Sequence, residues 1–255
     1  MPDHPDLRTG AVYGTGKREE NLRGYFAAIS AMDEQIGRLL DAVEEQGLAD
    51  NTVILFTADN GMSMGQHGVW GKGNGTFPMN MYDSAVKVPF LISWPGHIPA
   101  NTVCSEMISA CDLLPTILKL TGLSDKQPTG LPGRSFTELL EGRQLEHRDE
   151  VVIFDEYGPV RMIRTKEWKY VHRYPYGKHE LYHLVDDPGE EKNLYGLPEY
   201  KKLVTQLKGR MEKWFCTYSD PAIDGVRSAV NGSGQLCRPG VYAIYEDPFS
   251  PKGVE

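Results

Sequence analysis

The stretch that decides the fold is Thr52-Val53-Ile54-Leu55-Phe56-Thr57-Ala58-Asp59-Asn60-Gly61, an apolar run that ends in turn-forming polar residues. The run is short and rich in β-branched residues, which predicts a strand buried on both faces. Upstream, apolar residues recur at three- and four-residue steps from Leu22 to Val43, and Gly47 can end that segment, so we expect a long amphipathic helix. A helix that feeds such a strand is half of a βαβ unit and predicts an α/β fold with a parallel sheet.

The chain downstream continues this pattern and then changes period. We expect a second strand at Val88–Trp94 and a helix at Asp112–Leu120, with Asp112 as N-cap and Gly122 as stop signal. After residue 145, short strands predict an antiparallel sheet, and Pro198 opens one helix. The four strands are expected at Val151–Tyr157, Val160–Thr165, Trp168–Arg173 and Glu180–Val185. We therefore divide the chain into an arm or connecting loop (1–19), an α/β part (20–148), a small α+β part (149–218) and a Gly/Pro-rich tail (219–255).

Composition excludes several classes of protein. The 255 residues are 24% charged and 40% hydrophobic with a net charge of −8, which is typical of a soluble globular protein. No apolar stretch approaches the ~18 residues of a membrane span, and the acidic balance disfavours nucleic acid as a partner. The N-terminus lacks the features of a secretory signal, so the sequence assigns no compartment. The four cysteines form no C-x-x-C pair, although Cys216 and Cys237 could pair with each other.

Four polar residues follow the first predicted strand on one Gly-rich segment. Asp59 and Asn60 offer two hard oxygen donors, which suit Ca²⁺ or Mg²⁺, at the sheet edge where α/β proteins bind ligands. Lys72, flanked by Gly71 and Gly73, can approach a phosphate or sulfate closely, and His67 can exchange a proton near neutral pH. The alternative for Asp-Asn-Gly is a simple turn, and each cation alone is more often a solvated loop residue. Together they predict an anion site beside a cation site.

At this point the sequence resembles the sulfatases of the alkaline-phosphatase-like superfamily. The resemblance runs from about residue 20 to 215 and depends on the order of several short motifs. They are Thr52–Gly61, Gly65–Gly68, Gly71–Gly73, Tyr82-Asp83, Lys87–Ile92 with Trp94–Gly96, Asp112–Thr116, Glu180–Leu184 and Asp187–Glu190 with Asn193-Leu194. The implied fold is part of a mostly parallel sheet flanked by helices, followed by a small C-terminal antiparallel sheet with one helix.

The resemblance also implies roles for the site residues. Asp59 and Asn60 would bind the divalent cation, usually calcium, with magnesium less suitable. Lys72 would contact the sulfate, and His67 would lie near the sulfate or the leaving group. Zinc phosphatases of the superfamily favour histidine at the position of Asn60, so the all-oxygen pair here favours calcium over zinc. The implied substrate is a carbohydrate or aryl sulfate ester, and Trp70, Phe77 and Tyr82 are candidates either for stacking on it or for packing.

Two features depart from the family pattern. The family usually has a glutamate and an arginine where Asp83 and Lys87 stand, and we expect these two either to form a structural ion pair or to face solvent. The C-x-P-S-R-type motif that yields the formylglycine nucleophile is absent, as are two further aspartate ligands; Cys237-Arg238-Pro239-Gly240 is nearest, in the wrong order. We therefore expect the C-terminal half of a sulfuric ester hydrolase, inactive by itself.

Several interpretations of this half-domain stay open. The chain could be a shortened piece of a longer protein, a partner of a missing N-terminal half or of a second copy, or a noncatalytic remnant. Without central strands, it should expose an apolar sheet edge and face. Functionally, the alternatives to a sulfatase are a noncatalytic module that binds an anion, a sugar or a protein, and a phosphodiester or phosphonate monoester hydrolase. Relatives of the family are often periplasmic, secreted or lysosomal.

Overall fold

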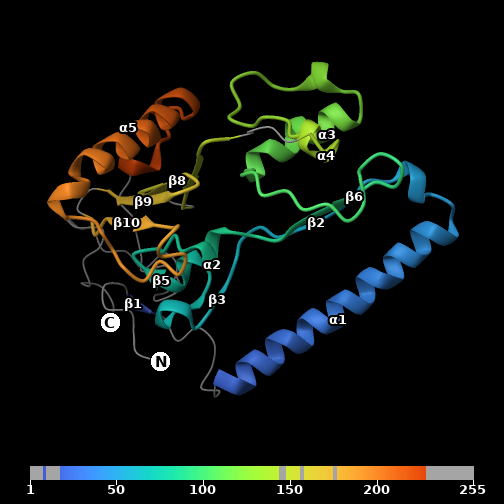
Figure 1. Ribbon diagram of the computed structural model, residues 1–255, viewed down its shortest axis with the longest axis horizontal. Coiled ribbons are helices and arrows are strands. Elements are labelled where there is room, and N and C mark those ends of the chain that lie inside the picture. Colours follow the sequence, from blue (N-terminus) through green and yellow to red (C-terminus); the bar gives the residue numbers. More distant parts are fainter. Residues whose placement is uncertain (1–7, 10–17, 144–147, 156–157, 175–176, 228–255) are drawn as a thin grey trace.

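A computed structural model describes residues 8–9, 18–143, 148–155, 158–174 and 177–227. It has one long helix, a two-stranded sheet beside it, and a four-stranded sheet covered by a second long helix (Figure 1). The helices are α1 (Arg18–Glu45), α2 (Asp83–Val86), α3 (Leu113–Leu120), α4 (Thr137–Leu140) and α5 (Lys201–Tyr218). The strands are β1 (Arg8–Thr9), β2 (Ile54–Thr57), β3 (Ser63–Met64), β4 (Trp70–Gly71), β5 (Thr76–Phe77), β6 (Phe90–Ser93), β7 (Val151–Phe154), β8 (Val160–Arg164), β9 (Trp168–Arg173) and β10 (Glu180–His183).

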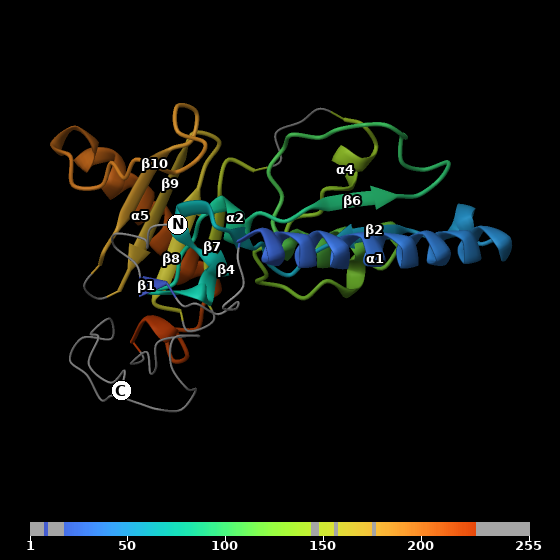
Figure 2. The ribbon, with the colours of Figure 1, turned by 90° about the horizontal axis from the view of Figure 1, so that it is seen from below.

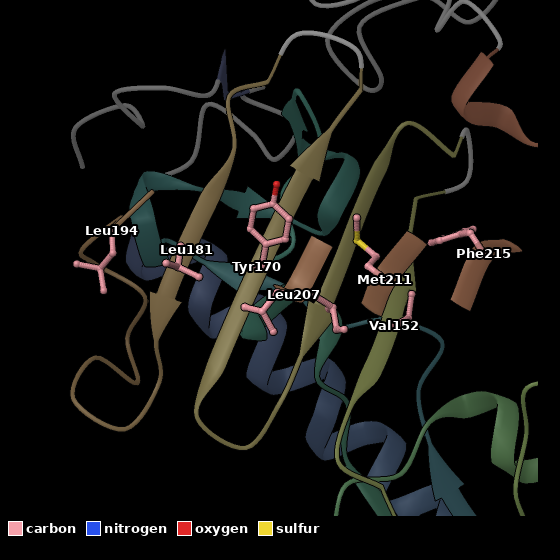
Figure 3. Packing of buried hydrophobic residues seen from close by; sticks show 8 residues of the cluster. Val152, Tyr170, Leu181, Leu194, Leu207, Met211 and Phe215 are labelled. Atoms are coloured by element: carbon pink, nitrogen blue, oxygen red, sulfur yellow. The ribbon is translucent and has the colours of Figure 1, made fainter. Parts of the chain in front are cut away.

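The four-stranded sheet and α5 confirm the predicted small antiparallel sheet with one helix. The strand order is β10-β9-β8-β7, and every neighbouring pair is antiparallel. Leu207, Met211 and Phe215 recur every four residues along α5 and are buried against this sheet. Figure 3 shows them facing Val152, Tyr170 and Leu181 of the strands, with Leu194 beside them. Because fully burying one such side chain contributes roughly 1.5–3 kcal/mol, this cluster is the main stabilising core.

The opposite face of the same sheet carries a second core. Met79 and Met81 pack there against Val160, Met162 and Val171. The residues of β8 and β9 alternate between the two faces, as the period of two in a strand requires. The sheet is thus sandwiched between α5 and the segment that connects β2 with β6 (Figure 1).

The α/β part differs from the expected pairing. Both predicted strands form, as β2 and β6, but they pair antiparallel, with Leu55 opposite Ile92. The sequence predicted a parallel sheet, whereas every strand pair within the described residues is antiparallel. Between β2 and β6 the chain returns through loops and the short α2, without a long crossover helix, so the second strand runs back along the first.

The predicted burial on both faces of the first strand is wrong for this chain. Leu55 on β2 is 36% exposed, and Leu91 on β6 is 65% exposed. Helix α1 ends as predicted near Gly47, which has a φ of +64°, yet none of its residues is buried. Figure 2 shows α1 extending along β2 and β6 at one end of the molecule, away from the four-stranded sheet. The apolar side chains exposed on it are Tyr25, Phe26, Ile29, Met32, Leu39 and Leu40.

Asp112 stands at the predicted N-cap position of helix α3, but its side chain makes no capping hydrogen bond to that helix. Its carboxylate accepts hydrogen bonds from the backbone N–H of Ser109 and of Arg134, at 2.8 and 2.7 Å, and from the guanidinium of Arg148. These donors hold the pKa of Asp112 below its usual range although burial opposes ionisation. Gly122, with a φ of +73°, ends the helix. Within the described residues, no helix is both long enough and apolar enough to cross a membrane.

The boundaries of the four segments predicted from the sequence (1–19, 20–148, 149–218 and 219–255) remain predictions. Of the expected arm (1–19), Arg8–Thr9 forms β1 and pairs with β5. Most of the expected tail (219–255) lies outside the described residues, and so does Cys237, the predicted partner of Cys216. The side chain of Cys216 is exposed on α5.

Candidate active site

The site loop, residues 59–87, leaves the carboxyl end of β2 and returns to β6. It contains the short hairpin of β3 and β4, in which Ser63 pairs with Gly71. This pairing folds the loop back on itself and brings the residue after β4, Lys72, to the residue just after β2. Three of the four predicted site residues therefore meet at one place.

Asp59, Asn60 and Lys72 form one hydrogen-bonded group. The backbone N–H of Asn60 donates to Asp59 Oδ1 at 2.8 Å, and Lys72 Nζ donates to Asn60 Oδ1 at 3.4 Å. Asp59 is exposed, whereas Asn60 and Lys72 are half-buried. A carboxylate, an amide oxygen and an ammonium group are thus placed within reach of one small charged ligand.

Gly61 is needed for close contact between the two ends of the site loop. Its N–H donates to the carbonyl of Ala85 at 2.8 Å, and a Cβ at this position would lie 2.2 Å from the carbonyl oxygen of Ser84. The hydroxyl groups of Ser63 and Ser84 meet at 2.7 Å beside this contact. The Asp-Asn-Gly tripeptide is therefore more than a turn, because its glycine fits against α2 and fixes Asn60 next to it.

His67 has a different support, the ring of Tyr82. The two rings are parallel within 6°, with centroids 3.7 Å apart. His67 has a φ of 55°, in the left-handed region, and lies between Gly65 and Gly68, which also have positive φ. Tyr82 is only 2% exposed, and burial raises its pKa above the ordinary value. Of the three aromatic candidates, Tyr82 is thus a packing residue, Trp70 is half-buried on β4, and the Phe77 side chain lies outside the described part.

The expected ion pair between Asp83 and Lys87 is wrong. Asp83 Oδ1 lies 2.5 Å from Lys169 Nζ, and Asp83 Oδ2 lies 3.4 Å from Arg164 Nη2, while Lys87 is exposed. Burial opposes ionisation of Asp83, but the charges of Lys169 and Arg164 outweigh it and hold the pKa of Asp83 below its usual range. The buried Lys169 requires a counter-charge, which an exposed Lys87 does not.

Sequence reasoning missed a set of buried charges beneath the site loop. Lys169 and Arg173 are both fully buried on β9, on the face that carries Val171 and packs against Met79 and Met81. Lys169 also pairs with Glu190 at 2.5 Å, and Arg173 pairs with Glu180 at 2.8 Å. The signal was present in the sequence, since the period of two in a strand places Lys169 and Arg173 on the same face of β9 as the apolar Val171.

Asp59 and Asn60 carry the kinds of oxygen donor that calcium takes. Calcium takes six to eight oxygen ligands, and Asp59 and Asn60 provide oxygen donors on adjacent residues. Among the described residues, no three His, Cys, Asp or Glu side chains gather closely enough to hold a metal ion. The donor types fit calcium, but Asp59 and Asn60 together supply fewer oxygen donors than the six to eight ligands that calcium takes.

Two family models match the chain. The model described as N-sulphoglucosamine sulphohydrolase, C-terminal, matches residues 65–216, and the model described as Sulfatase matches residues 3–123. Together they cover the site loop, the four-stranded sheet and α5. The first match alone extends over more than half of the 255 residues.

Known proteins and solved structures agree with these matches. An N-acetylglucosamine-6-O-sulfatase of Bacteroides thetaiotaomicron is 31% identical in an alignment of 230 positions that covers 84% of this chain and 39% of that protein. A protein solved with its substrate D-glucosamine-2-N,6-O-disulfate is 30% identical with a TM-score of 0.71, covering 84% of this chain and 45% of that one. The phosphonate monoester hydrolase of Agrobacterium radiobacter is 27% identical with a TM-score of 0.65, covering 76% and 41%.

These likenesses confirm the predicted α/β fold class and the predicted family. The chain spans less than half the length of each of these three proteins. The motif order from Asp59 to Asn193, the two family matches and the shared fold lead to one conclusion. This chain belongs to the sulfatase family.

Proposed function

We propose that this chain provides the cation and sulfate contacts of a sulfuric ester hydrolase. Asp59 and Asn60 bind a divalent cation, calcium in preference to magnesium, and Lys72 binds the sulfate of the substrate. The observation that carries the proposal is the 3.4 Å contact between Lys72 Nζ and Asn60 Oδ1, since it joins the anion-binding group to the cation-binding group. Membership of the sulfatase family supports the same roles.

The chemistry follows from the charges. In hydrolysis of a sulfate ester an oxygen nucleophile, which these residues do not supply, bonds to sulfur as the S–O bond to the leaving oxygen breaks. Negative charge then develops on the leaving oxygen and stays on the sulfuryl oxygens. The Lys72 ammonium stabilises the sulfuryl oxygens, and His67, held on the Tyr82 ring, gives a proton to the leaving oxygen. A bound cation would add Lewis-acid stabilisation of the sulfuryl group. The substrate class we propose is a carbohydrate or aryl sulfate.

We also propose that the exposed apolar surface of α1, β2 and β6 packs against a further part of the sulfatase α/β domain. Phe26 is 58% exposed, Leu39 67% and Leu91 65%, and large exposed apolar surfaces mark interaction sites. The relatives are more than twice as long as the region they share with this chain, and the proposal assigns part of that further length to this surface. That segment would supply the nucleophile and the remaining cation ligands, because the C-x-P-S-R pattern does not occur in these 255 residues.

The test is a sulfatase assay of the protein encoded by the complete open reading frame that contains these residues. We expect hydrolysis of an aryl sulfate that EDTA abolishes and that calcium restores better than magnesium. Lys72→Ala should raise KM, and Asp59→Ala should lower kcat/KM by at least about 100-fold, a size typical of lost electrostatic stabilisation. Asp125→Ala is the matched control, because Asp125 is exposed and pairs with the neighbouring Lys126. Full activity of Asp59→Ala would overturn the cation role.

Two alternatives give different results in the same assay. A phosphonate or phosphodiester hydrolase, with which the similarity to the phosphonate monoester hydrolase is consistent, would show a higher kcat/KM on phosphate or phosphonate esters than on sulfate esters. A noncatalytic module would show no turnover on any of these esters while still binding inorganic sulfate through Lys72. The 255 residues alone are expected to show no turnover under the sulfatase proposal.

A further inference from the structure

Two buried cations of β9 hold the backbone of the site loop from below. Lys169 Nζ donates to the carbonyl oxygen of Met81 at 3.0 Å. Arg173 donates to the carbonyl oxygen of Met79 through Nε at 3.3 Å and Nη2 at 3.0 Å. Both side chains are fully buried, so these bonds are made away from water, where charged hydrogen bonds are strong.

The residue between the two held carbonyls is Asn80, which is 1% exposed and reaches Lys72. Its amide nitrogen donates to the carbonyls of Lys72 at 3.4 Å and Gly73 at 3.1 Å, and its backbone N–H donates to Gly73 at 3.0 Å. The backbone that carries the Lys72 side chain is thus tied through Asn80 to a strand about a hundred positions later in the chain. A shift of Met79 or Met81 would move Lys72 with it.

The next residue along the loop, Tyr82, supports His67. Because Tyr82 follows Met81 directly, the bond from Lys169 to the Met81 carbonyl also fixes the ring on which the His67 imidazole lies. Lys169 further binds Asp83 at 2.5 Å, the residue after Tyr82. The backbone N–H of Asp83 in turn donates to Glu190 at 2.6 Å, so both sides of Tyr82 are held.

Both buried cations have carboxylate partners within the protein. Lys169 faces the carboxylates of Asp83 and Glu190, and Arg173 faces Glu180. Buried ion pairs add little to stability compared with apolar packing, since their desolvation cost offsets most of the attraction. Buried cations at this position are better explained by the geometry they impose than by stability, because an apolar side chain could not hold a carbonyl oxygen.

We infer that Lys169 and Arg173 are positioning residues that set Lys72 and His67 for sulfate binding and proton transfer. The inference rests on the proposed function of Lys72 and His67. It means that the small C-terminal sheet does more than cover the α/β part, because its β9 determines how well the site loop binds an anion.

The experiment compares Lys169→Met, Lys169→Arg and Lys72→Ala in the complete enzyme, with inorganic sulfate as competitive inhibitor. Misplacement by about 1 Å can cost on the order of 100-fold, so we expect Lys169→Met to raise the sulfate Ki and the KM by ~10-fold or more. Lys169→Arg, which keeps the cation, should recover part of this loss. Hydrogen exchange of residues 72–83 should speed up in Lys169→Met, as a readout that is independent of turnover.

Arg148→Met is the matched control for stability. It also breaks a buried ion pair, with Asp112, but that pair holds Ser109 and Arg134 and not the site loop. We expect it to lower the melting temperature about as much as Lys169→Met and to leave the sulfate Ki unchanged. An equal rise of Ki in Arg148→Met and Lys169→Met, or an unchanged Ki in a folded Lys169→Met, would overturn the inference.

Asn80→Ala provides a second route, needed if Lys169→Met does not fold. It cuts the connection to Lys72 and leaves both cations with their carboxylates, so the same rise of Ki is expected, and an unchanged Ki contradicts the inference. Lys72→Ala distinguishes a failure of the proposed sulfate-binding role of Lys72 from a failure of the proposed positioning role of Lys169. If it leaves the sulfate Ki unchanged, the proposed function itself fails; if it raises Ki while Asn80→Ala and Lys169→Met do not, the positioning inference alone fails.

Discussion

The imidazole of His67 lies flat on the phenol ring of Tyr82, with ring centroids 3.7 Å apart and planes 6° apart. Tyr82 is itself buried and receives a hydrogen bond from Tyr182 of β10. A residue of the site loop thus rests on a ring that the C-terminal sheet supports. The contact explains why a half-buried histidine with a positive φ keeps one orientation.

Removing the supporting ring should loosen His67 and destabilise the protein. Tyr82→Ala should cost about 3–5 kcal/mol of unfolding free energy, as truncations of buried aromatic residues do. Tyr82→Phe keeps the ring stack and should cost only about 1 kcal/mol for the lost hydrogen bond. Urea unfolding measures both values, and the ring-current shift of the His67 protons should persist in Tyr82→Phe alone. Equal losses in the two variants would contradict the importance of the stack.

Gly61→Ala should be strongly destabilising because the added Cβ would lie 2.2 Å from the carbonyl oxygen of Ser84. Forcing an extra methyl group into a packed site typically costs about 1–3 kcal/mol. The matched control is Gly37→Ala, which lies inside α1 with no atom within 4 Å of the added Cβ and should stabilise the chain by ~0.5–1 kcal/mol. Thermal unfolding of the two variants gives shifts of opposite sign; a neutral Gly61→Ala would exclude the close contact.

The stability of the C-terminal part should fall with acid between pH 6.5 and about 4. Burial lowers the pKa of His172 to about 3 and that of His179 to about 4, and the two rings stack 4.0 Å apart. Between these values and 6.5 the unfolded chain binds more protons than the folded one, so stability is lost as pH falls. The slope is at most about 1.4 kcal/mol per pH unit for each histidine. His172→Gln should flatten the urea-midpoint profile in this window, and an unchanged profile would contradict the assignment.

Charge on the exposed face of α1 should not unfold the chain. Phe26 is 58% exposed, so Phe26→Glu should change the unfolding free energy by less than ~0.5 kcal/mol while reducing the binding of a hydrophobic dye. Met211→Ala, on the buried face of α5, is the contrasting variant and should cost about 2–5 kcal/mol. A large loss for Phe26→Glu would show that this face is packed within the chain.

In the complete protein the same Phe26→Glu should behave differently. If a further part of the α/β domain covers α1, the charge becomes buried, and the melting temperature and the soluble yield should both fall. A second copy as the occupant would instead be seen as a dimer of the 255 residues that Phe26→Glu dissociates, measured by light scattering. If Phe26→Glu leaves the melting temperature and the soluble yield of the complete protein unchanged, the proposal that another segment covers this face of α1 is wrong.

Local sequence patterns were enough to determine most elements of this protein. The period of α1, the stop at Gly122 and the alternation in β8 and β9 predicted the segments observed, because helix and strand periods depend on neighbouring residues. The family and the group of Asp59, Asn60 and Lys72 also followed from short motifs. Cation and anion binding could be proposed for these residues before their distances were known, because hard oxygen donors suit a divalent cation and an ammonium suits an anion.

Contacts between distant segments were decided only by the tertiary structure. The antiparallel pairing of β2 with β6 and the choice of Lys169, not Lys87, as the partner of Asp83 depend on residues far apart in the chain. No local period reports which strand lies beneath a loop. The sequence by itself therefore determined which segments form and which residues are candidates for binding, while the packing of the site loop on β9 determined how those residues are held. A buried charge selects its partner by proximity after folding, and its neighbours in the sequence do not reveal that partner.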